Sequence, residues 1–483
     1  MADTQQFFKE QSFINGEWVK ADSGKTFAVD NPADGKIVAN VADMGAPETT
    51  RAVEAAYAAF PAWKKMLAKD RAKILRKWSD LIVANADALA ALLTMEQGKP
   101  LAEAKGEIIN GAGFIEWYAD EGRRVYGDTI PPMKDSARII ITKEPIGVVG
   151  AITPWNFPSS MITRKLGPAL GAGCTAVLKP AAETPLSALA LAVLAEQAGM
   201  PKGVFNIVTG KDAAAIGQVL TTHPHVKKIS FTGSTEVGKV LLAQAASTVK
   251  KSSMELGGNA PFIVFNSADL DKAVEGAVAS KYRNAGQTCI CANRIYVQDG
   301  IFEEFTRRLT EKVKAMKIGP GNEAGVSIGP LINQKGFDKA RRHIDDAVAK
   351  GAALVYGGGQ NAAGGLFMTP AILTGMTPDM MMTQEETFGP VAGLYRFADE
   401  AEVIALANDT RFGLASYFYT NELGQAFRVA EALEYGMVAV NESLLSYEAA
   451  PFGGVKESGL GREGSKYGLE DYLSIKYTLV GGI

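Results

Sequence analysis

β-Rich runs alternate with segments of helical spacing through the first half of the chain. The runs that predict strands are Arg138–Ile141, Gly147–Ile152, Thr175–Leu178, Val204–Val208 and Lys228–Phe231. Helical patterns such as Leu186–Gly199 separate them. Strand, helix and strand in succession predict a parallel sheet that helices cover.

A second α/β pattern begins after Glu255. Its predicted strands are Pro261–Phe265, Arg294–Val297 and Met437–Val440, and its predicted helices are Ile301–Met316 and Gln334–Lys350. Ahead of both patterns, apolar positions between Arg51 and Gly98 predict two amphipathic helices with a structural role. The glycine-rich span Gly357–Gly365 is expected to be a surface loop, because apolar segments follow it directly.

Length and composition limit the class of protein. A chain of 483 residues is too long for one ordinary core, so at least two large lobes are expected. Apolar residues make up 47% and charged residues 21%, with a net charge of −3, which describes a soluble globular protein. Nucleic acid and anionic membranes are therefore not expected partners.

Cysteine usage and the N-terminal sequence indicate a compartment. Cys174, Cys289 and Cys291 are too few and too unevenly placed for a secreted disulfide framework. The chain begins without a basic or apolar leader, and its most apolar stretch, Ala188–Ala195, is shorter than the roughly 20 residues of a membrane span. A cytoplasmic protein is expected.

Histidine chemistry has little support, because the chain contains only His223, His225 and His343. The first two flank Pro224 in a predicted loop, and no cluster of cysteines or carboxylates completes a coordination shell. No metal site is expected. A hydrolase with a Cys-His pair is disfavoured, since neither histidine region resembles a positioned base.

Cys289 is the first candidate for chemistry. It follows Asn284-Ala285-Gly286-Gln287-Thr288, a composition typical of a loop that presents a side chain rather than of a core. Glu255 lies 34 residues upstream, ahead of two glycines. A thiol that attacks a carbonyl and a carboxylate that activates water are the reagents for oxidising an aldehyde through a thioester.

Two signals suit a bound cofactor, and a third does not. The run Ser230–Gly238 ends a predicted strand and opens a helix, where glycines and a helix N-terminus favour a phosphate. Lys179 closes another predicted strand, and parallel sheets bind ligands at that end. A formal G-x-G-x-x-G match at Gly459–Gly464 follows no convincing strand, so a turn is expected there.

Seven motifs, in order, resemble those of the aldehyde dehydrogenase superfamily over nearly the whole chain. Within it, the chain most closely resembles the succinate-semialdehyde dehydrogenases. The motifs are Thr153-Pro154-Trp155-Asn156-Phe157-Pro158, Leu178-Lys179-Pro180, Phe231-Thr232-Gly233-Ser234, Glu255-Leu256-Gly257-Gly258, Gln287-Thr288-Cys289, Glu385-Glu386-Thr387-Phe388-Gly389-Pro390 and Pro451-Phe452-Gly453-Gly454.

The resemblance implies an α/β fold with a Rossmann-like cofactor domain, an α/β catalytic domain and a small β oligomerisation element. The expected boundaries are 1–123 and 144–256 for the NAD(P)-binding domain, 257–450 for the catalytic domain, and 124–143 with 451–483 for the oligomerisation element. A homo-oligomer, either a dimer or a tetramer, is implied.

The resemblance also implies catalytic roles. Cys289 matches the nucleophile, Glu255 the general base, and Asn156 the side chain that holds the oxyanion together with the Cys289 backbone N–H. One such donor is worth on the order of 3 kcal/mol in related acyl chemistry. Because Glu255 is present, hydrolysis of the thioester is favoured over transfer to coenzyme A.

The positions that the resemblance assigns to the cofactor span several motifs. Glu386 matches the acid on the nicotinamide ribose, Phe388 the aromatic residue near the ring, Lys179 the adenosine ribose contact, and Ser234 the pyrophosphate contact. Ala182 stands where relatives commonly carry a glutamate that repels a 2′-phosphate, so NADP is expected to be preferred and NAD possible, although Glu183 is adjacent. The full predicted set is Trp155, Lys179, Ala182, Gly233, Ser234, Gly238, Glu386 and Phe388.

For the substrate, Arg164, Arg283 and Ser446 match the residues that hold the far carboxylate of a semialdehyde. Two guanidiniums in one pocket would repel each other without an anion between them, which favours an ω-carboxylated aldehyde. Succinate semialdehyde is the first candidate. Glutarate semialdehyde, one methylene longer, and a broader range of aldehydes remain open, because Ser443 and Tyr447 are unusual.

Alternatives from other classes are a non-catalytic relative and a thiol hydrolase acting on esters. The joint presence of Cys289, Glu255 and Asn156 argues against the first, and dehydrogenase turnover would exclude the second. Cys291, two residues after the nucleophile, also raises the hypothesis of a regulatory Cys289–Cys291 bridge, with a packed spectator thiol as the equal alternative.

Overall fold

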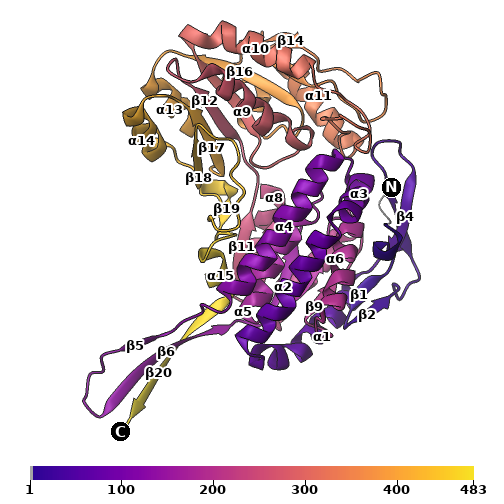
Figure 1. Ribbon diagram of the computed structural model, residues 1–483, viewed down its shortest axis with the longest axis vertical. Helices are drawn as coiled ribbons and strands as arrows, with labels where there is room; N and C mark the ends of the chain where they lie inside the picture. The colour runs from indigo at the N-terminus through magenta and orange to yellow at the C-terminus, as the bar shows by residue number, and fades with distance from the viewer. Residues whose placement is uncertain (1–3) are drawn as a thin grey trace.

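The computed structural model describes residues 4–483, and its first lobe is built on an eight-stranded sheet (Figure 1). The strand order is β19-β11-β10-β7-β8-β9-β1-β2. Strands β7 to β11 run parallel, and β1, β2 and β19 pair antiparallel at the two edges. The bounds are β1 Ser12–Ile14, β2 Glu17–Val19, β7 Val148–Ile152, β8 Thr175–Lys179, β9 Phe205–Ile207, β10 Val226–Thr232, β11 Lys251–Glu255 and β19 Gly459–Leu460.

Helices cover both faces of this sheet, because successive strand residues point to opposite sides. On β8, Ala176 and Leu178 pack with the core of α2 to α6, and Val177 packs with the core of α1, α7 and α8. The predicted parallel α/β sheet is therefore confirmed. The bounds are α1 Ala46–Lys65, α2 Ala68–Ala84, α3 Ala86–Gln97, α4 Leu101–Glu121, α5 Ser160–Ala172, α6 Pro185–Ala198, α7 Ala213–Thr222 and α8 Thr235–Ala246.

The segment between Arg51 and Gly98 departs from the prediction. It contains parts of three helices, α1, α2 and α3, instead of two. Asn85 breaks the second helix from the third, and its side-chain amide donates to the carbonyl of Leu81 at 2.8 Å. The apolar spacing continues across this one-residue break, so periodicity alone did not reveal it.

A seven-stranded sheet forms the second lobe, with the order β14-β15-β16-β13-β12-β17-β18. All of its pairs are parallel except β14 with β15. The strands are β12 Ala260–Val264, β13 Ala292–Gln298, β14 Ala353–Tyr356, β15 Ala371–Thr374, β16 Val391–Phe397, β17 Ala415–Tyr419 and β18 Met437–Val440. The helices are α9 Leu270–Tyr282, α10 Phe302–Lys314, α11 Gln334–Ala349, α12 Met381–Gln384, α13 Glu400–Asn408 and α14 Leu423–Ala432.

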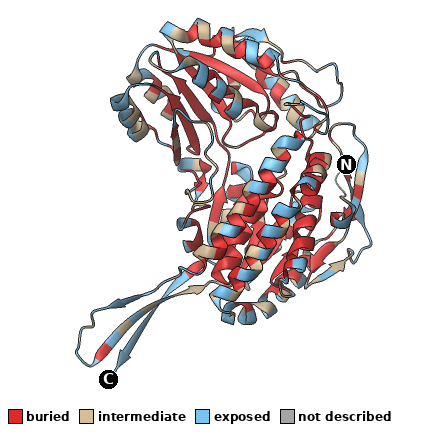
Figure 2. Cartoon of the chain, viewed as in Figure 1, coloured by how far each residue is buried: buried red, intermediate tan, exposed pale blue. Residues whose placement is uncertain are grey.

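A thin three-stranded sheet projects from the body of the molecule (Figure 1). It consists of β5 Asp128–Ile130, β6 Ala137–Pro145 and β20 Leu473–Gly481, and β20 pairs with β6 along its whole length. Figure 2 shows that this arm is mostly exposed. Two smaller elements complete the fold: the hairpin of β3 Thr26–Asp30 with β4 Ile37–Ala42, and the short helix α15 Tyr467–Glu470.

The run Gly459–Gly464 is not only the turn that was expected. Gly459 and Leu460 form β19 against the end of β11, beside Glu255. A Cβ on Gly459 would lie 2.0 Å from the carbonyl oxygen of Met254, so only glycine allows this close approach. Part of the 451–483 segment therefore belongs to the large sheet, and the division into domains stays a prediction.

Within residues 4–483, no single helix is long and apolar enough to cross a lipid bilayer. The bent pair of α2 and α3 reaches the required length and composition together, and many of its side chains lie in the core of the first lobe.

Candidate active site

The carboxyl ends of the parallel strands in the first lobe meet at one edge of the sheet. Ile152 pairs with Lys179 at the ends of β7 and β8, and Thr232 pairs with Glu255 at the ends of β10 and β11. Open α/β sheets bind ligands at this edge. The loops that leave these strands carry Asn156 and Gly233, and Glu255 is the last residue of β11.

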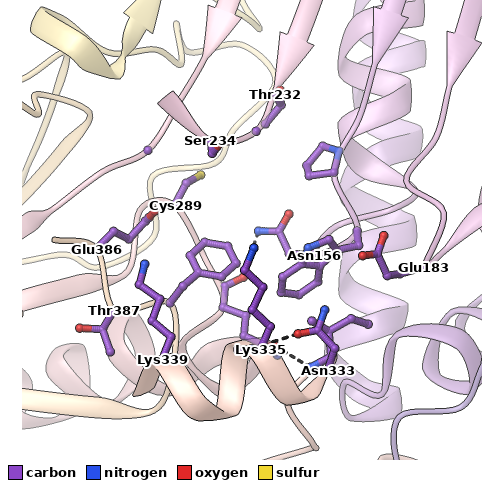
Figure 3. Close-up of a pocket in the computed structure, with 18 of the residues that line it drawn as sticks. Asn156, Glu183, Thr232, Ser234, Cys289, Asn333, Lys335, Lys339, Glu386 and Thr387 are labelled. Atoms are coloured by element: carbon purple, nitrogen blue, oxygen red, sulfur yellow. Dashed lines mark hydrogen bonds between the residues drawn. The ribbon is translucent and has the colours of Figure 1, made fainter. Parts of the chain in front are cut away.

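A cleft of about 410 Å³ lies between this edge and the second lobe (Figure 3). Seven of the predicted residues line it: Trp155, Asn156, Gly233, Ser234, Cys289, Glu386 and Phe388. Residues of α11, from the second lobe, close its other side. The structure thus brings together the Trp-Asn, Thr-Gly-Ser, Thr-Cys and Glu-Thr-Phe motifs, which are far apart in sequence.

Three residues predicted to bind the cofactor are not among those that line the cleft. Lys179 is buried, and its ammonium donates to the carbonyl of Pro180 at 3.0 Å. Ala182 lies beside the cleft, and the neighbouring Glu183 reaches into it. Gly238 is a packing residue, since a Cβ there would lie 2.4 Å from Leu256.

Cys289 follows a sharply folded segment. Asn284 and Ala285 have φ angles of 51° and 54°, and a Cβ on Gly286 would lie 2.2 Å from the carbonyl oxygen of Gly389. Such left-handed residues outside glycine are uncommon and cluster at functional sites. Burial, and then the charge of Glu386, raise the pKa of the Cys289 thiol to about 12, so the resting thiol holds its proton at neutral pH.

Glu255 is buried, and neither of its carboxylate oxygens has a hydrogen-bond partner within the described chain. Burial and then the charge of Glu463 raise its pKa well above the usual range, against the opposing charge of Arg164. The charge of Glu255 also contributes to the raised pKa of Cys289, so the two groups are close enough to interact. A buried, unpartnered acid with a raised pKa suits a general base.

Asn156 is held between the lobes. Its side-chain amide donates to the main-chain carbonyl of Gln287, two residues before the nucleophile, at 3.0 Å. Both Asn156 and Cys289 line the cleft, and Figure 3 shows both side chains at its wall. The second amide hydrogen of Asn156 is therefore available for an oxyanion formed at Cys289.

The wide part of the cleft fits a nicotinamide dinucleotide. Ser234 caps α8, and its hydroxyl oxygen accepts from the N–H of Val237 at 3.3 Å, which leaves the hydroxyl hydrogen for a phosphate. Trp155 and Phe388 form an edge-to-face pair with ring centroids 5.5 Å apart. Glu386 accepts from the N–H of Gly258 at 3.4 Å, and burial raises its pKa to about 7.

On the other side of Cys289 lies a much smaller pocket of about 20 Å³. The three residues predicted to hold the substrate carboxylate, Arg164, Arg283 and Ser446, all line it together with the nucleophile. Ser446 lies 3.4 Å from Asn110 of α4 through its hydroxyl. The prediction that these three distant residues share one pocket is thus met in position, and their roles stay a prediction.

Arg164 has a resident counter-ion, which the sequence did not indicate. Its Nε lies 3.0 Å from Oε2 of Glu463, and the guanidinium stacks on Phe452 at 3.9 Å. The expected repulsion between two unpaired guanidiniums is therefore reduced. Two buried nitrogens of Arg164, Nε and Nη2, make no hydrogen bond in residues 4–483, and Nη2, which has no ion-pair partner there either, remains suited to an anion.

The remaining cysteines and histidines take no part in the cleft. All three cysteines are free, and the thiol of Cys291 donates to the carbonyl of Lys281 at 3.1 Å. His343 is fully buried behind the Glu385–Phe388 loop, and burial lowers its pKa to about 4. No group of three or more His, Cys, Asp or Glu side chains suited to a metal ion occurs within the described residues.

Comparison with known proteins identifies the family. The aldehyde dehydrogenase family model matches residues 18–478. The chain belongs to the aldehyde dehydrogenase family. It is 60% identical to a glutarate-semialdehyde dehydrogenase of Pseudomonas aeruginosa, with 99% of each chain covered. It is 59% identical to an NADP⁺ succinate-semialdehyde dehydrogenase of Escherichia coli, with 98% of each covered.

The solved structures of the family confirm the predicted fold. A crystal structure of a succinate-semialdehyde dehydrogenase from Burkholderia pseudomallei superposes with a TM-score of 0.98 at 58% identity, covering 99% of each chain. The aldehyde dehydrogenase fold class expected from the sequence is therefore correct. The two relatives named above are almost equally similar to this family member and carry different substrates in their names.

Sequence reasoning missed several residues of this aldehyde dehydrogenase site. Lys335 and Lys339 of α11 line the cofactor cleft, and Glu107 and Asn110 of α4 line the inner pocket. The two lysines are four residues apart on a helix that Asn333 caps, a spacing that places both on one face. The spacing of Lys335 and Lys339 could have been read from the sequence, because the helix that carries them was predicted. No such pattern pointed to Glu107 and Asn110, because no helix was predicted for their segment.

Proposed function

We propose that this aldehyde dehydrogenase oxidises an ω-carboxylated semialdehyde to the dicarboxylic acid with reduction of NAD(P). The observation that supports this most directly is the position of Cys289. The thiol stands where the cofactor cleft meets the pocket that holds Arg164, Arg283 and Ser446. A semialdehyde with its carboxylate in that pocket has its carbonyl carbon at the sulfur.

The reaction follows from the groups around the sulfur. Cys289 passes its proton by way of Glu255 to solvent, its sulfur attacks the carbonyl carbon, and the new oxyanion accepts hydrogen bonds from the Asn156 amide and the Cys289 N–H. Bound NAD(P)⁺ would accept the hydride that leaves this carbon. Glu255 then takes a proton from water, which attacks the thioester, releases the acid and restores the thiol.

Succinate semialdehyde is the first candidate substrate. The inner pocket holds little more than one water-sized group, so a longer chain must displace its lining residues. Glutarate semialdehyde is the second candidate, because the relative from Pseudomonas aeruginosa carries that name at 60% identity. One methylene is worth only about 1–3 kcal/mol, which permits both substrates.

NADP is the proposed coenzyme, with NAD accepted. Ala182 places no carboxylate at the predicted ribose position, and Lys335 and Lys339 add positive charge to the cleft. The E. coli relative is named for NADP⁺. Glu183 opposes this preference, because its carboxylate reaches the cleft and repels a 2′-phosphate.

Steady-state kinetics test these proposals together. Succinate semialdehyde, glutarate semialdehyde and an uncharged aldehyde of matched length are each measured with NAD⁺ and with NADP⁺. The expected order of kcat/KM is succinate semialdehyde, glutarate semialdehyde and then the uncharged compound, with NADP⁺ preferred. Equal efficiency on the uncharged aldehyde would contradict a carboxylate-binding role for the two arginines.

The projecting three-stranded sheet is proposed to mediate self-association. The projecting sheet exposes Ile475, Tyr477 and Leu479 on β20 with 73%, 55% and 51% of their surface accessible. Contiguous apolar surface of this kind marks protein interfaces. The arm is proposed to pair with other copies of the chain, and light scattering is expected to give a mass of two or four chains.

A further inference from the structure

A buried lysine lies on the turn between α3 and α4, away from any surface. The ammonium of Lys99 donates to Oε2 of Glu107 and to the main-chain carbonyl of Asn156, both at 2.6 Å. It also lies 3.9 Å from the ring centre of Phe157. A buried charge is stable only when it has such partners. One of these partners, the carbonyl of Asn156, belongs to the residue that is proposed to hold the oxyanion.

The second lobe reaches the same carbonyl oxygen. The side-chain amide of Asn284 donates to the carbonyl of Asn156 at 3.0 Å and to the carbonyl of Gln287 at 3.2 Å. Its own oxygen accepts from the side-chain amide of Gln97 at 3.0 Å, which fixes how the Asn284 amide is turned. All of these side chains are buried.

Glu107 extends the network past Asn156 along the chain. While Oε2 holds Lys99, Oε1 accepts from the N–H of Ser159 at 2.9 Å and of Ser160 at 3.1 Å, at the start of α5. Lys99 and Glu107 together therefore fix the backbone at Asn156 and just after it. The same helix carries Arg164 into the inner pocket.

We propose that Lys99 and Asn284 are positioning residues that hold the Asn156 amide at Cys289 by gripping one carbonyl oxygen from two lobes. Two donors on that oxygen fix the peptide plane after Asn156, and the side-chain direction follows from the backbone. Electrostatic stabilisation depends on donors placed before the reaction begins. The inference rests on the proposed oxyanion role of Asn156.

Two variants remove the two grips separately. Asn284→Gly keeps a residue type that tolerates the left-handed backbone and removes the amide donor without placing a charge against the two carbonyls. Lys99→Met combined with Glu107→Gln removes the ammonium without leaving an unpaired buried charge, so the fold is expected to persist. Thermal unfolding confirms that each variant is folded, and either variant alone suffices for the test.

Each variant is measured in the wild-type and in the Asn156→Ala background. A misplaced catalytic group costs roughly 10- to 100-fold, so kcat/KM for succinate semialdehyde is expected to fall by that factor in the wild-type background. In the Asn156→Ala background the further loss is expected to be below about 2-fold, because the amide to be positioned is gone. The rate of Cys289 alkylation by iodoacetamide, which needs no oxyanion donor, is expected to stay unchanged.

Two results would overturn the inference, and they are distinguishable. If a variant lowers kcat/KM by the same factor in the wild-type and in the Asn156→Ala background, the losses are additive, and the variant acts through general packing rather than through Asn156. If Asn156→Ala alone keeps wild-type turnover, the proposed oxyanion role fails and the positioning role fails with it. A normal Asn156→Ala effect with additive losses would reject only the positioning role.

Discussion

Two cavities of unlike construction meet at Cys289. The cofactor cleft, of about 410 Å³, is lined on one side by loops that leave the ends of parallel strands and on the other by α11 and loops of the second lobe. The inner pocket, of about 20 Å³, is lined by side chains from α4, α5 and three loops, and two of its charged residues, Glu107 and Arg164, are already ion-paired. The cofactor cleft therefore depends on strand ends and loops, whereas the inner pocket depends on contacts between side chains that are far apart in the sequence.

The difference explains how one nucleophile serves two ligands. A dinucleotide is long and is recognised by many weak contacts, which a strand edge and a helix N-terminus supply. A carboxylate on a short chain needs a few strong contacts at fixed positions. Arg164, which is ion-paired to Glu463, stacks on Phe452 and leaves Nη2 without a hydrogen bond in residues 4–483, is proposed to perform the second task.

The largest expected effect is on the group that both cavities share. Cys289→Ser should lower kcat at least roughly 1000-fold, because a serine hydroxyl at this position lacks a base strong enough to activate it. Nucleotide binding, measured by quenching of tryptophan fluorescence, should stay near the wild-type value. The matched control is Cys291→Ser, which should retain activity, since that thiol faces the carbonyl of Lys281.

If Cys289→Ser retained dehydrogenase activity, the shared junction would not be the reaction centre, and the comparison of the two cavities would lose its basis. Weak binding of nucleotide by the same variant would instead show that Cys289 supports the cleft structurally.

The next effect separates the inner pocket from the cleft. Arg283→Met removes one charged donor, worth about 1.5–3 kcal/mol, so KM for succinate semialdehyde should rise roughly 10- to 100-fold. KM for an uncharged aldehyde and the Kd of NADP⁺ should change little. Arg123→Met, at an exposed arginine outside both cavities, is the control.

An equal rise of KM for charged and uncharged aldehydes would mean that Arg283 shapes the pocket and does not bind the carboxylate. Its guanidinium lies 5.1 Å from the ring of Phe157, so such a packing role is physically available.

The converse variant acts on the cleft alone. Lys339→Met removes a half-buried charge near the cofactor, and KM for the nucleotide should rise roughly 3- to 10-fold. The ratio of kcat/KM for succinate semialdehyde over the uncharged aldehyde should stay constant.

The charge of Lys339 also lowers the pKa of Glu386 against the effect of burial, so the variant should shift that pKa above about 7. Lys69→Met is an exposed control. A changed substrate ratio would contradict the independence of the two cavities.

The two cavities also differ in how far the sequence predicts them. Strand ends and motifs led to Trp155, Gly233 and Ser234, because residues that follow consecutive parallel strands must share one edge. Cys289 was singled out by the loop-like composition around it, and its role as the nucleophile stays a prediction, whereas the fold class was correct. The three helices between Arg51 and Gly98 were counted as two.

The inner pocket depended on contacts that no local pattern encodes. Glu107 and Asn110 lie on α4, which contains Gly106, Gly111 and Gly113 and therefore gives a weak helical pattern. Gly111 is required by packing, because a Cβ there would lie 2.9 Å from the hydroxyl of Thr163 on α5. The same close packing that brings α4 to the pocket hides the helix in the sequence.

Folding stability, rather than activity, shows what the burial of Glu255 costs. An unfolded glutamate has a pKa of about 4.3, and burial raises the pKa of Glu255 well above that value in the folded chain. Below pH 4.3 both states hold the proton. As the pH rises, the unfolded chain releases it first, so the wild type loses about 1.4 kcal/mol per pH unit until the folded pKa is reached. Glu255→Gln carries no charge and escapes this loss.

The stability gain of Glu255→Gln over the wild type should therefore grow from pH 5 upward and level off once Glu255 ionises in the folded chain. Thermal unfolding at a series of pH values measures this, with Glu431→Gln as an exposed control that should show no such trend. A constant gain at every pH would mean that Glu255 stays ionised throughout, because the charges of Arg164 and Lys165 stabilise its carboxylate. The shape of this curve thus decides whether burial or the neighbouring charges govern the ionisation of Glu255.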